Sequence, residues 1–205
     1  WGQFEKKERS KIVTYAMSGS IEAIGKVGWD NIRHYCNKFD YLSFRETVLA
    51  DRFTSLLEER CFNSLDPTLL TTAQIWLPML NYKWQKRKYV LLYHVGGPNE
   101  IIDSMTHKAK EIAEQEGLEL IDASNYLYSP SDFISLIKYA QYRVTASFHA
   151  MVFSIVFHKA FVVVKTGQAS DIRFNNLLSI LEIEKTNLKD IDNISIPVKP
   201  NYDKI

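Results

Sequence analysis

A serine, a phenylalanine and a histidine stand where a predicted strand turns into a predicted helix. They are Ser147, Phe148 and His149, and the apolar, β-branched run 142–146 precedes them. In a β-α-β unit, this end of a parallel strand is where ligands bind. The Ser147 hydroxyl can cap the helix, the helix start attracts anions, and His149 titrates near neutral pH. The turn therefore predicts a site for an anionic small molecule that needs a proton donor. The alternative is that Ser147 only caps the helix and His149 is an ordinary first-turn residue.

The elements around this turn read as strand, helix, strand. After the turn, residues 149–157 are long enough for a helix of about three turns, and residues 161–164 form a second short apolar run. Positive residues such as Lys159 suit the end of a helix. Charged residues, among them Arg143 and Lys159, interrupt the apolar stretch, so it is too short for the ~20 residues that a bilayer requires. We therefore expect buried strands and no membrane span.

Arg45 occupies an equivalent position earlier in the chain. It follows the apolar start of a predicted strand, 41–46, and precedes a predicted helix, 47–59. A guanidinium at that edge can bind a carboxylate or phosphate through two parallel hydrogen bonds. The alternative pairs Arg45 with Glu46 or Glu59 at the surface.

Composition narrows the class of protein. The chain has 205 residues, 46% of them hydrophobic, and a formal net charge of +1. This is typical of a globular protein, and the balanced charge gives no reason to expect nucleic acid as a partner. The two cysteines, Cys36 and Cys61, match neither a metal site nor a disulfide framework, which indicates a reducing compartment and buried thiols. No signal peptide is present, so we expect a cytoplasmic protein.

Strands and helices alternate over the second half of the chain, which predicts an α/β fold with a doubly wound parallel sheet. The expected strands are 89–95, 118–121, 142–146 and 161–164, and the expected helices are 100–116, 133–140, 149–157 and 171–183. In the first half we expect a strand at 11–16 opening onto the small-residue loop 17–20, and a helix at 29–39. The basic, aromatic stretch 82–88 suggests a linker, so we expect domains at 1–85 and 86–190, with a tail at 191–205.

Three segments in this order resemble the polysaccharide pyruvyl transferase family. They are SFRE at 43–46, DPTLL at 66–70 and TASFHAMVFSI at 145–155, and the segments 11–20 and 170–183 are also similar to the family's pattern. The resemblance covers most of residues 11–183. It implies two facing Rossmann-like domains of the glycosyltransferase-B kind. The family's first strands would then lie before Trp1, so we expect the N-terminal domain to be incomplete in this chain.

The resemblance also implies an activity. The family transfers the enolpyruvyl group of phosphoenolpyruvate to a sugar or glycolipid acceptor, usually closing a pyruvate ketal and releasing phosphate, and needs no metal or other cofactor. Acceptors are precursors of surface or capsular polysaccharides, so the enzyme would work in the cytoplasm or at the inner face of the membrane, with peripheral contact through a lipid-linked acceptor.

By the same resemblance, His149 and Arg45 act on phosphoenolpyruvate, and Ser147 and Phe148 belong to the binding turn. Lys165 and Arg173 are further candidates for its phosphate, the alternative for each being a solvated surface role.

Two other functions fit the same architecture. A glycosyltransferase or sugar-nucleotide epimerase would place His149 near a nucleotide diphosphate. A non-enzymatic assembly protein of a polysaccharide cluster would carry a decayed site, although the presence of Arg45 and His149 argues against it.

Overall fold

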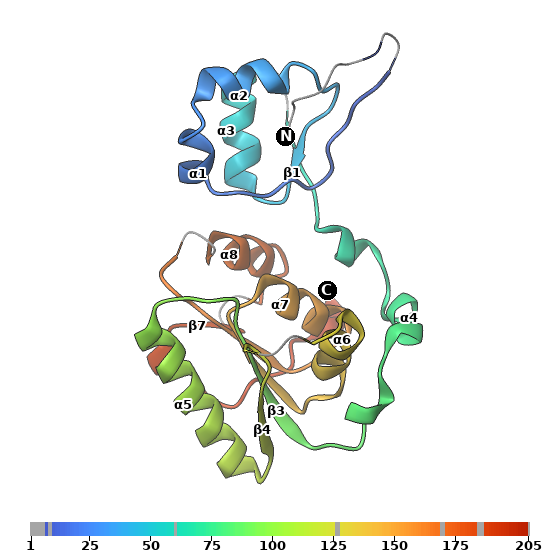
Figure 1. Cartoon of the computed structure of the whole chain (residues 1–205), viewed down its shortest axis with the longest axis vertical. Coiled ribbons are helices and arrows are strands. Elements are labelled where there is room, and N and C mark those ends of the chain that lie inside the picture. The colour runs from blue at the N-terminus through green and yellow to red at the C-terminus, as the bar shows by residue number, and fades with distance from the viewer. Residues whose placement is uncertain are drawn as a thin grey trace. The chain divides into compact units, whose positions relative to one another are not determined.

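The computed structural model describes residues 7, 10–59, 61–125, 128–168, 171–183 and 187–204. The chain divides into two compact units, Trp1–Leu70 and Thr71–Ile205 (Figure 1). Each unit contains parallel strands and helices, which confirms the expected α/β class. That the two units form a pair of facing Rossmann-like domains stays a prediction.

A parallel sheet forms the centre of the second unit. Its strands are β3 (Tyr89–Tyr93), β4 (Glu119–Asp122), β5 (Tyr142–Thr145), β6 (Phe161–Val164) and β7 (Leu188–Lys189), in the order β4-β3-β5-β6-β7. The side chains of β6 are all buried, as a short apolar run between two layers of helices requires. The four strands expected in this half are therefore confirmed to within two residues at each end.

Helices cover both faces of this sheet (Figure 1). On one face, Met105, Ala109 and Ile112 of α5 (Asn99–Glu116) pack against the strands. On the other face lie α6 (Pro130–Tyr139) and α7 (Phe148–Val156). The helix α8 (Asp171–Ile180) follows β6. The expected doubly wound arrangement is therefore present in this unit.

The strand order creates a switch point between β3 and β5. From β3 the chain passes through α5 to β4 on one side, then returns through α6 to β5 on the other side. Connections that leave in opposite directions open a crevice at the carboxyl ends of the two strands. The turn after β5 is therefore the place where this fold would bind a ligand.

The charged residue within β5 is buried by the sheet. The Arg143 side chain is 1% exposed, and its guanidinium donates to the carbonyl oxygens of Ile137 (2.7 Å), Gln141 (3.1 Å) and Ala160 (3.1 Å), and also to Ala140. These carbonyls lie at the end of α6 and before β6. Arg143 thus links the end of α6 to the residue before β6 through hydrogen bonds.

A smaller parallel sheet lies in the first unit. The strands β1 (Ser43–Phe44) and β2 (Phe62–Asn63) are paired, and α1 (Ile21–Gly25), α2 (Trp29–Cys36) and α3 (Thr47–Leu57) accompany them. The expected strand at 11–16 is wrong as a continuous strand, because only single bridges link Val13 to Tyr41 and Met17 to Phe44. The hydroxyl of Ser43 and a carboxylate oxygen of Asp40 accept backbone N–H bonds from this segment in place of a regular ladder.

The boundary between the units differs from the expected position near Gln85. Residues 71–85, which include α4 (Ala73–Trp76), belong to the second unit. Trp84 is 6% exposed, and its indole N–H donates to Asp132 Oδ1 at 2.8 Å. The backbone N–H of Asn81 donates to Ser135 Oγ at 2.6 Å. Buried aromatic packing and hydrogen bonds to α6 thus outweigh the linker-like composition of this stretch.

The segment 191–205, expected as a tail, belongs to the second unit, as do the residues just before it. Leu188 and Lys189 form β7 beside β6, and Ile194 packs into the apolar cluster on the α5 face. The Asn187 amide donates to Val198 O at 3.0 Å, and the Tyr202 hydroxyl donates to Lys159 O at 2.8 Å. Residues described beyond position 190 are therefore part of the second unit.

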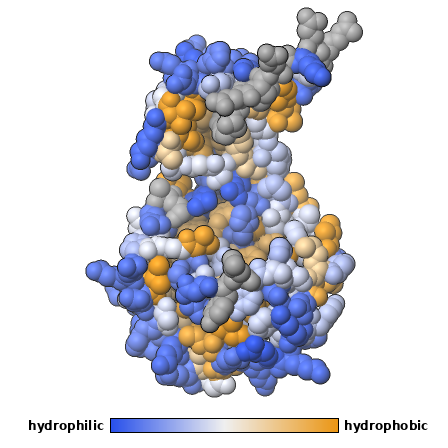
Figure 2. Space-filling view, viewed as in Figure 1, coloured by the Kyte–Doolittle hydropathy of each residue, from blue (hydrophilic) through white to orange (hydrophobic). Residues whose placement is uncertain are grey.

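The visible face carries apolar residues in small groups between hydrophilic ones (Figure 2). Among the residues described, no helix is both long and apolar enough to cross a membrane.

Candidate functional site

A pocket of about 270 Å³ opens at the carboxyl edge of the second unit's sheet. It is lined by residues that follow β3, β5 and β6 and by the start of α8. The pocket therefore includes the switch point between β3 and β5, where the strand order predicts a ligand.

The turn after β5 is shaped by two hydroxyl groups. Thr145 Oγ1 donates to Tyr93 O at 2.6 Å and accepts the N–H of Ser147 at 3.0 Å. Ser147 Oγ in turn accepts the N–H of Ala150 at 3.4 Å, so Ser147 caps α7 as its position predicts. These bonds fix the first turn of α7 against the end of β3.

His149 and Phe148 both line the pocket from this first turn. His149 is exposed, whereas Phe148 is 8% exposed and packs into the unit. Their ring centroids lie 5.6 Å apart in an edge-to-face arrangement. The exposed imidazole thus lines the pocket at the start of a helix, where the helix dipole favours an anion.

The two further candidates for phosphate binding have different positions. Arg173 lies in the first turn of α8 and lines the pocket. Lys165 follows β6 directly and is not among the residues that line it. Instead, Lys165 Nζ lies 3.4 Å from Asp190 Oδ1. The structure therefore brings Ser147, Phe148, His149 and Arg173 together and leaves Lys165 beside that group.

Sequence reasoning missed the other six residues of this pocket. Among them are Gly96, which follows β3, and Thr166 and Gln168, which follow β6. The rule that ligands bind beyond the carboxyl ends of parallel strands could have singled out these three, since each stands just after a predicted strand. Their residue types carry no group that ionises near neutral pH, so they did not draw notice.

Arg45 belongs to the first unit, at the carboxyl end of β1. Its guanidinium donates to Asp66 Oδ2 rather than pairing with Glu46 or Glu59, so the alternative pairing was wrong. The two side chains are 15% and 4% exposed, respectively, so this ion pair is largely buried. Burial alone would raise the pKa of Asp66, but hydrogen bonds from Thr68 and Arg45 outweigh it and hold the pKa below its usual value. The DPTLL segment thus supplies the carboxylate that orients the arginine of SFRE.

Glu46 adds a second buried carboxylate at this edge. It is 2% exposed, and its Oε1 accepts a hydrogen bond from Ser18 Oγ at 2.6 Å. The backbone N–H of Arg45 donates to Met17 O at 2.9 Å. The small-residue loop 17–20 is therefore attached to the end of β1.

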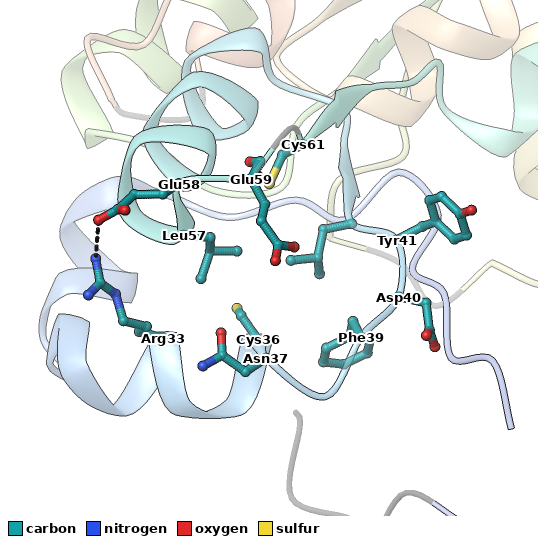
Figure 3. Close-up of a pocket in the computed structure, with 11 residues that line it drawn as sticks. Arg33, Cys36, Asn37, Phe39, Asp40, Tyr41, Leu57, Glu58, Glu59 and Cys61 are labelled. Carbon is teal, nitrogen blue, oxygen red and sulfur yellow. Dashed lines mark hydrogen bonds and ion pairs between the residues drawn. The ribbon is translucent and has the colours of Figure 1, made fainter. Parts of the chain in front are cut away.

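Another pocket, of about 420 Å³, lies at the opposite, amino ends of β1 and β2 (Figure 3). Arg33 lines it and donates through Nε to Leu56 O at 2.9 Å, with Glu58 at 3.9 Å from its Nη2. Burial and the neighbouring Cys61 raise the pKa of the Cys36 thiol to about 12, and burial also raises that of Cys61. Both thiols are buried and free, as expected, and a raised pKa keeps them from acting as nucleophiles at neutral pH.

Within the described part of the chain, no three His, Cys, Asp or Glu side chains gather in a way that could hold a metal ion. The pocket at the switch point instead combines a helix start, a histidine, a guanidinium and hydroxyl groups. This set of groups suits an oxygen-rich anion.

Comparison with known families shows that the family model described as "Polysaccharide pyruvyl transferase" matches residues 4–167. The matched region includes Arg45, Asp66 and His149 and ends before Asp171 and Arg173. No curated protein matches the chain.

Proposed function

Because the chain belongs to the polysaccharide pyruvyl transferase family, we propose that it transfers the enolpyruvyl group of phosphoenolpyruvate to a polysaccharide precursor. The family is one of transferases, and pyruvyl transfer to polysaccharide follows from membership. The observation that carries the choice of donor is the pocket that holds His149 and Arg173 at the start of two helices.

The pocket's groups complement the donor. Phosphoenolpyruvate carries a phosphate and a carboxylate, and the start of α7, capped by Ser147, favours an anion. Arg173 supplies a guanidinium that can bind two oxygens of one phosphate. We assign the phosphate to these groups and treat Lys165, which faces Asp190, as a weaker candidate.

The reaction requires a proton donor. A proton adds to the methylene carbon of phosphoenolpyruvate while a sugar hydroxyl, losing its proton, bonds to the adjacent carbon. Phosphate then leaves with its bonding electrons and a proton, and a second hydroxyl closes the ketal as it loses its own proton. We assign one of two roles to His149: it donates the proton to the methylene carbon, or it donates a hydrogen bond to the leaving phosphate.

Arg45 is assigned to the donor carboxylate. A guanidinium can bind a carboxylate through two parallel hydrogen bonds, which suits this role. Its pairing with a buried aspartate would hold it in one orientation, which a binding arginine needs. The acceptor is a sugar or glycolipid, with peripheral membrane contact where the acceptor is lipid-linked.

The test is phosphorus NMR of phosphoenolpyruvate with the protein and a panel of galactose, mannose and N-acetylmannosamine glycolipids. We expect phosphate release that depends on an acceptor. His149→Ala should lower the turnover by about 100-fold or more, which is typical for loss of an acid or base. His107→Ala is the matched control, since that imidazole is exposed on α5.

An unchanged rate in His149→Ala would remove His149 from the mechanism. If phosphoenolpyruvate stays intact and its signal does not broaden on addition of protein, the donor is wrong. Protection of the protein by uridine diphosphate sugars would then favour a nucleotide-sugar enzyme.

A further inference from the structure

The carboxylate of Asp171 organises the loop that closes one side of the pocket. Asp171 Oδ2 accepts the backbone N–H groups of Thr166 at 2.9 Å and Gly167 at 2.8 Å, and Oδ1 accepts the Thr166 hydroxyl at 3.0 Å. The Asp171 N–H donates to Gln168 O at 2.9 Å. With 9% of its surface exposed, Asp171 does not itself line the pocket.

These bonds connect two parts of the pocket wall. Thr166 and Gln168 line the pocket from the loop after β6, and Arg173 lines it from the helix that Asp171 begins. The loop turns through Gly167 at φ 72°, a left-handed conformation that side-chain-bearing residues rarely adopt. One carboxylate therefore sets the position of the loop relative to the first turn of α8.

We propose that Asp171 is a positioning residue for the donor: its carboxylate holds the 166–168 loop and Arg173 in the arrangement that binds the phosphate. The proposal rests on the function proposed above and adds a residue that lies beyond the matched region. Asp171 acts through its neighbours and does not touch the substrate.

The charge of the Asp171 carboxylate and its hydrogen bonds have opposite expected effects on binding of the anionic donor. A carboxylate near an anion site repels the ligand, so if its charge were its main effect, its removal would tighten binding. If Asp171 acts by position, removal of its hydrogen bonds weakens binding, while an uncharged side chain that keeps them does not. Asparagine can keep them, because its oxygen can accept both N–H groups while its amide donates to the Thr166 hydroxyl.

The experiment compares Asp171→Ala, Asp171→Asn and Asp122→Ala in the whole chain. Asp122 is the matched control, since it accepts the Ser124 N–H at 2.9 Å at the end of β4 but does not line the pocket. The readouts are the affinity for phosphoenolpyruvate and for inorganic phosphate by phosphorus NMR, KM and kcat with an active acceptor, and the melting temperature.

We expect Asp171→Ala to raise the Kd and KM for phosphoenolpyruvate by about tenfold with little change in kcat, and Asp171→Asn and Asp122→Ala to stay near the wild type. Unchanged KM in Asp171→Ala, with only a lower melting temperature, would show a structural role alone. If Asp171→Ala does not fold, Asp171→Ser serves instead, because serine suits a helix start but is too short to bind both amides.

The two proposals fail in different ways. If the wild type binds phosphoenolpyruvate and Asp171→Ala binds it equally well, the role of Asp171 is refuted and the donor stands. If the wild type binds neither phosphoenolpyruvate nor phosphate, both proposals fall.

Discussion

At the scale of single residues, the candidate groups gain their orientation from hydrogen bonds that reach segments far away in sequence. Arg45 is held by Asp66, which is 21 positions away, and the turn before His149 is held by Thr145, which bonds the end of β3. Both partners lie within the motifs that suggested the family, which gives those motifs a physical reason. SFRE and DPTLL meet as an ion pair, and the threonine and serine of TASFH build the start of α7.

The ion pair predicts a pH-dependent loss of stability in Asp66→Asn. A buried charge left without its partner is costly, so we expect the first unit to lose about 3 kcal/mol of unfolding free energy at neutral pH. The pKa of Asp66 is lowered by folding, so its carboxylate stabilises the protein above the unfolded-state pKa, and this stability is lost as the pH falls through the lower folded-state pKa. The difference between wild type and variant should therefore shrink towards about pH 3.

Urea titrations at the two pH values, with hydrogen exchange of α3 amides reporting the first unit, measure this effect. Asp51→Asn is the control, because Asp51 is an exposed aspartate of α3. This substitution should change the unfolding free energy little at either pH. A difference that stays constant between the two pH values would contradict the assignment.

At the scale of elements, the first turns of α7 and α8 line the pocket, and the local sequence predicts the residue that caps α7. Ser147 caps α7 and Ser129 caps α6 by the same type of bond, in which the backbone N–H three residues on donates to the serine hydroxyl oxygen. Only the first of these turns lines the pocket. Substitution of each of these two serines can therefore distinguish the contribution of a cap to stability from its contribution to ligand binding.

We predict that Ser147→Ala and Ser129→Ala each cost about 1 kcal/mol of stability, as N-cap substitutions generally do. Ser147→Ala should also weaken binding of phosphoenolpyruvate, because the turn that faces the ligand loosens, whereas Ser129→Ala should leave the affinity unchanged. Thermal unfolding and phosphorus NMR titration measure the two quantities. Equal affinities in both variants would show that the α7 start does not contact the donor.

At the scale of the whole molecule, the second unit includes two segments that the sequence placed elsewhere: residues 71–85, expected in the first domain, and residues 191–205, expected as a tail. Residues 71–85 attach through Trp84 and Asn81, and the stretch after residue 187 attaches through β7 and Tyr202. The anchors are the buried indole of Trp84, hydrogen bonds from Asn81 and Tyr202, and the pairing of β7 with β6. The unit that carries His149 therefore depends on residues well outside its central β-α alternation.

Trp84→Ala tests this dependence. We expect a loss of about 3 kcal/mol or more from the second unit, because a buried aromatic side chain and its hydrogen bond to Asp132 disappear. Hydrogen exchange should become faster in β3 and α6 but not in β1 and α3. Lys86→Ala, at an exposed position nearby, is the control. If hydrogen exchange in β3 and α6 is unchanged in Trp84→Ala, Trp84 does not stabilise the second unit.

Much of the fold could be predicted from the chain alone, because its cause is local. Runs such as 161–164 are short, apolar and β-branched, Ser147 stands where a cap must stand, and Gly117 ends α5 in a left-handed conformation. The alternation of such elements leads to a parallel sheet with helices on both faces, and the turn that carries His149 lies beyond the strands of this sheet, where the alternation places it.

The remaining features depend on pairings across long sequence separations, which no local pattern encodes. The partner of Arg45, the packing of Trp84, the strand β7 and the three hydrogen bonds that Asp171 accepts all follow from which side chains the folded backbone brings within bonding distance. A buried charge or indole takes the partner that satisfies it at the least cost of desolvation, and only the folded chain shows which group that is.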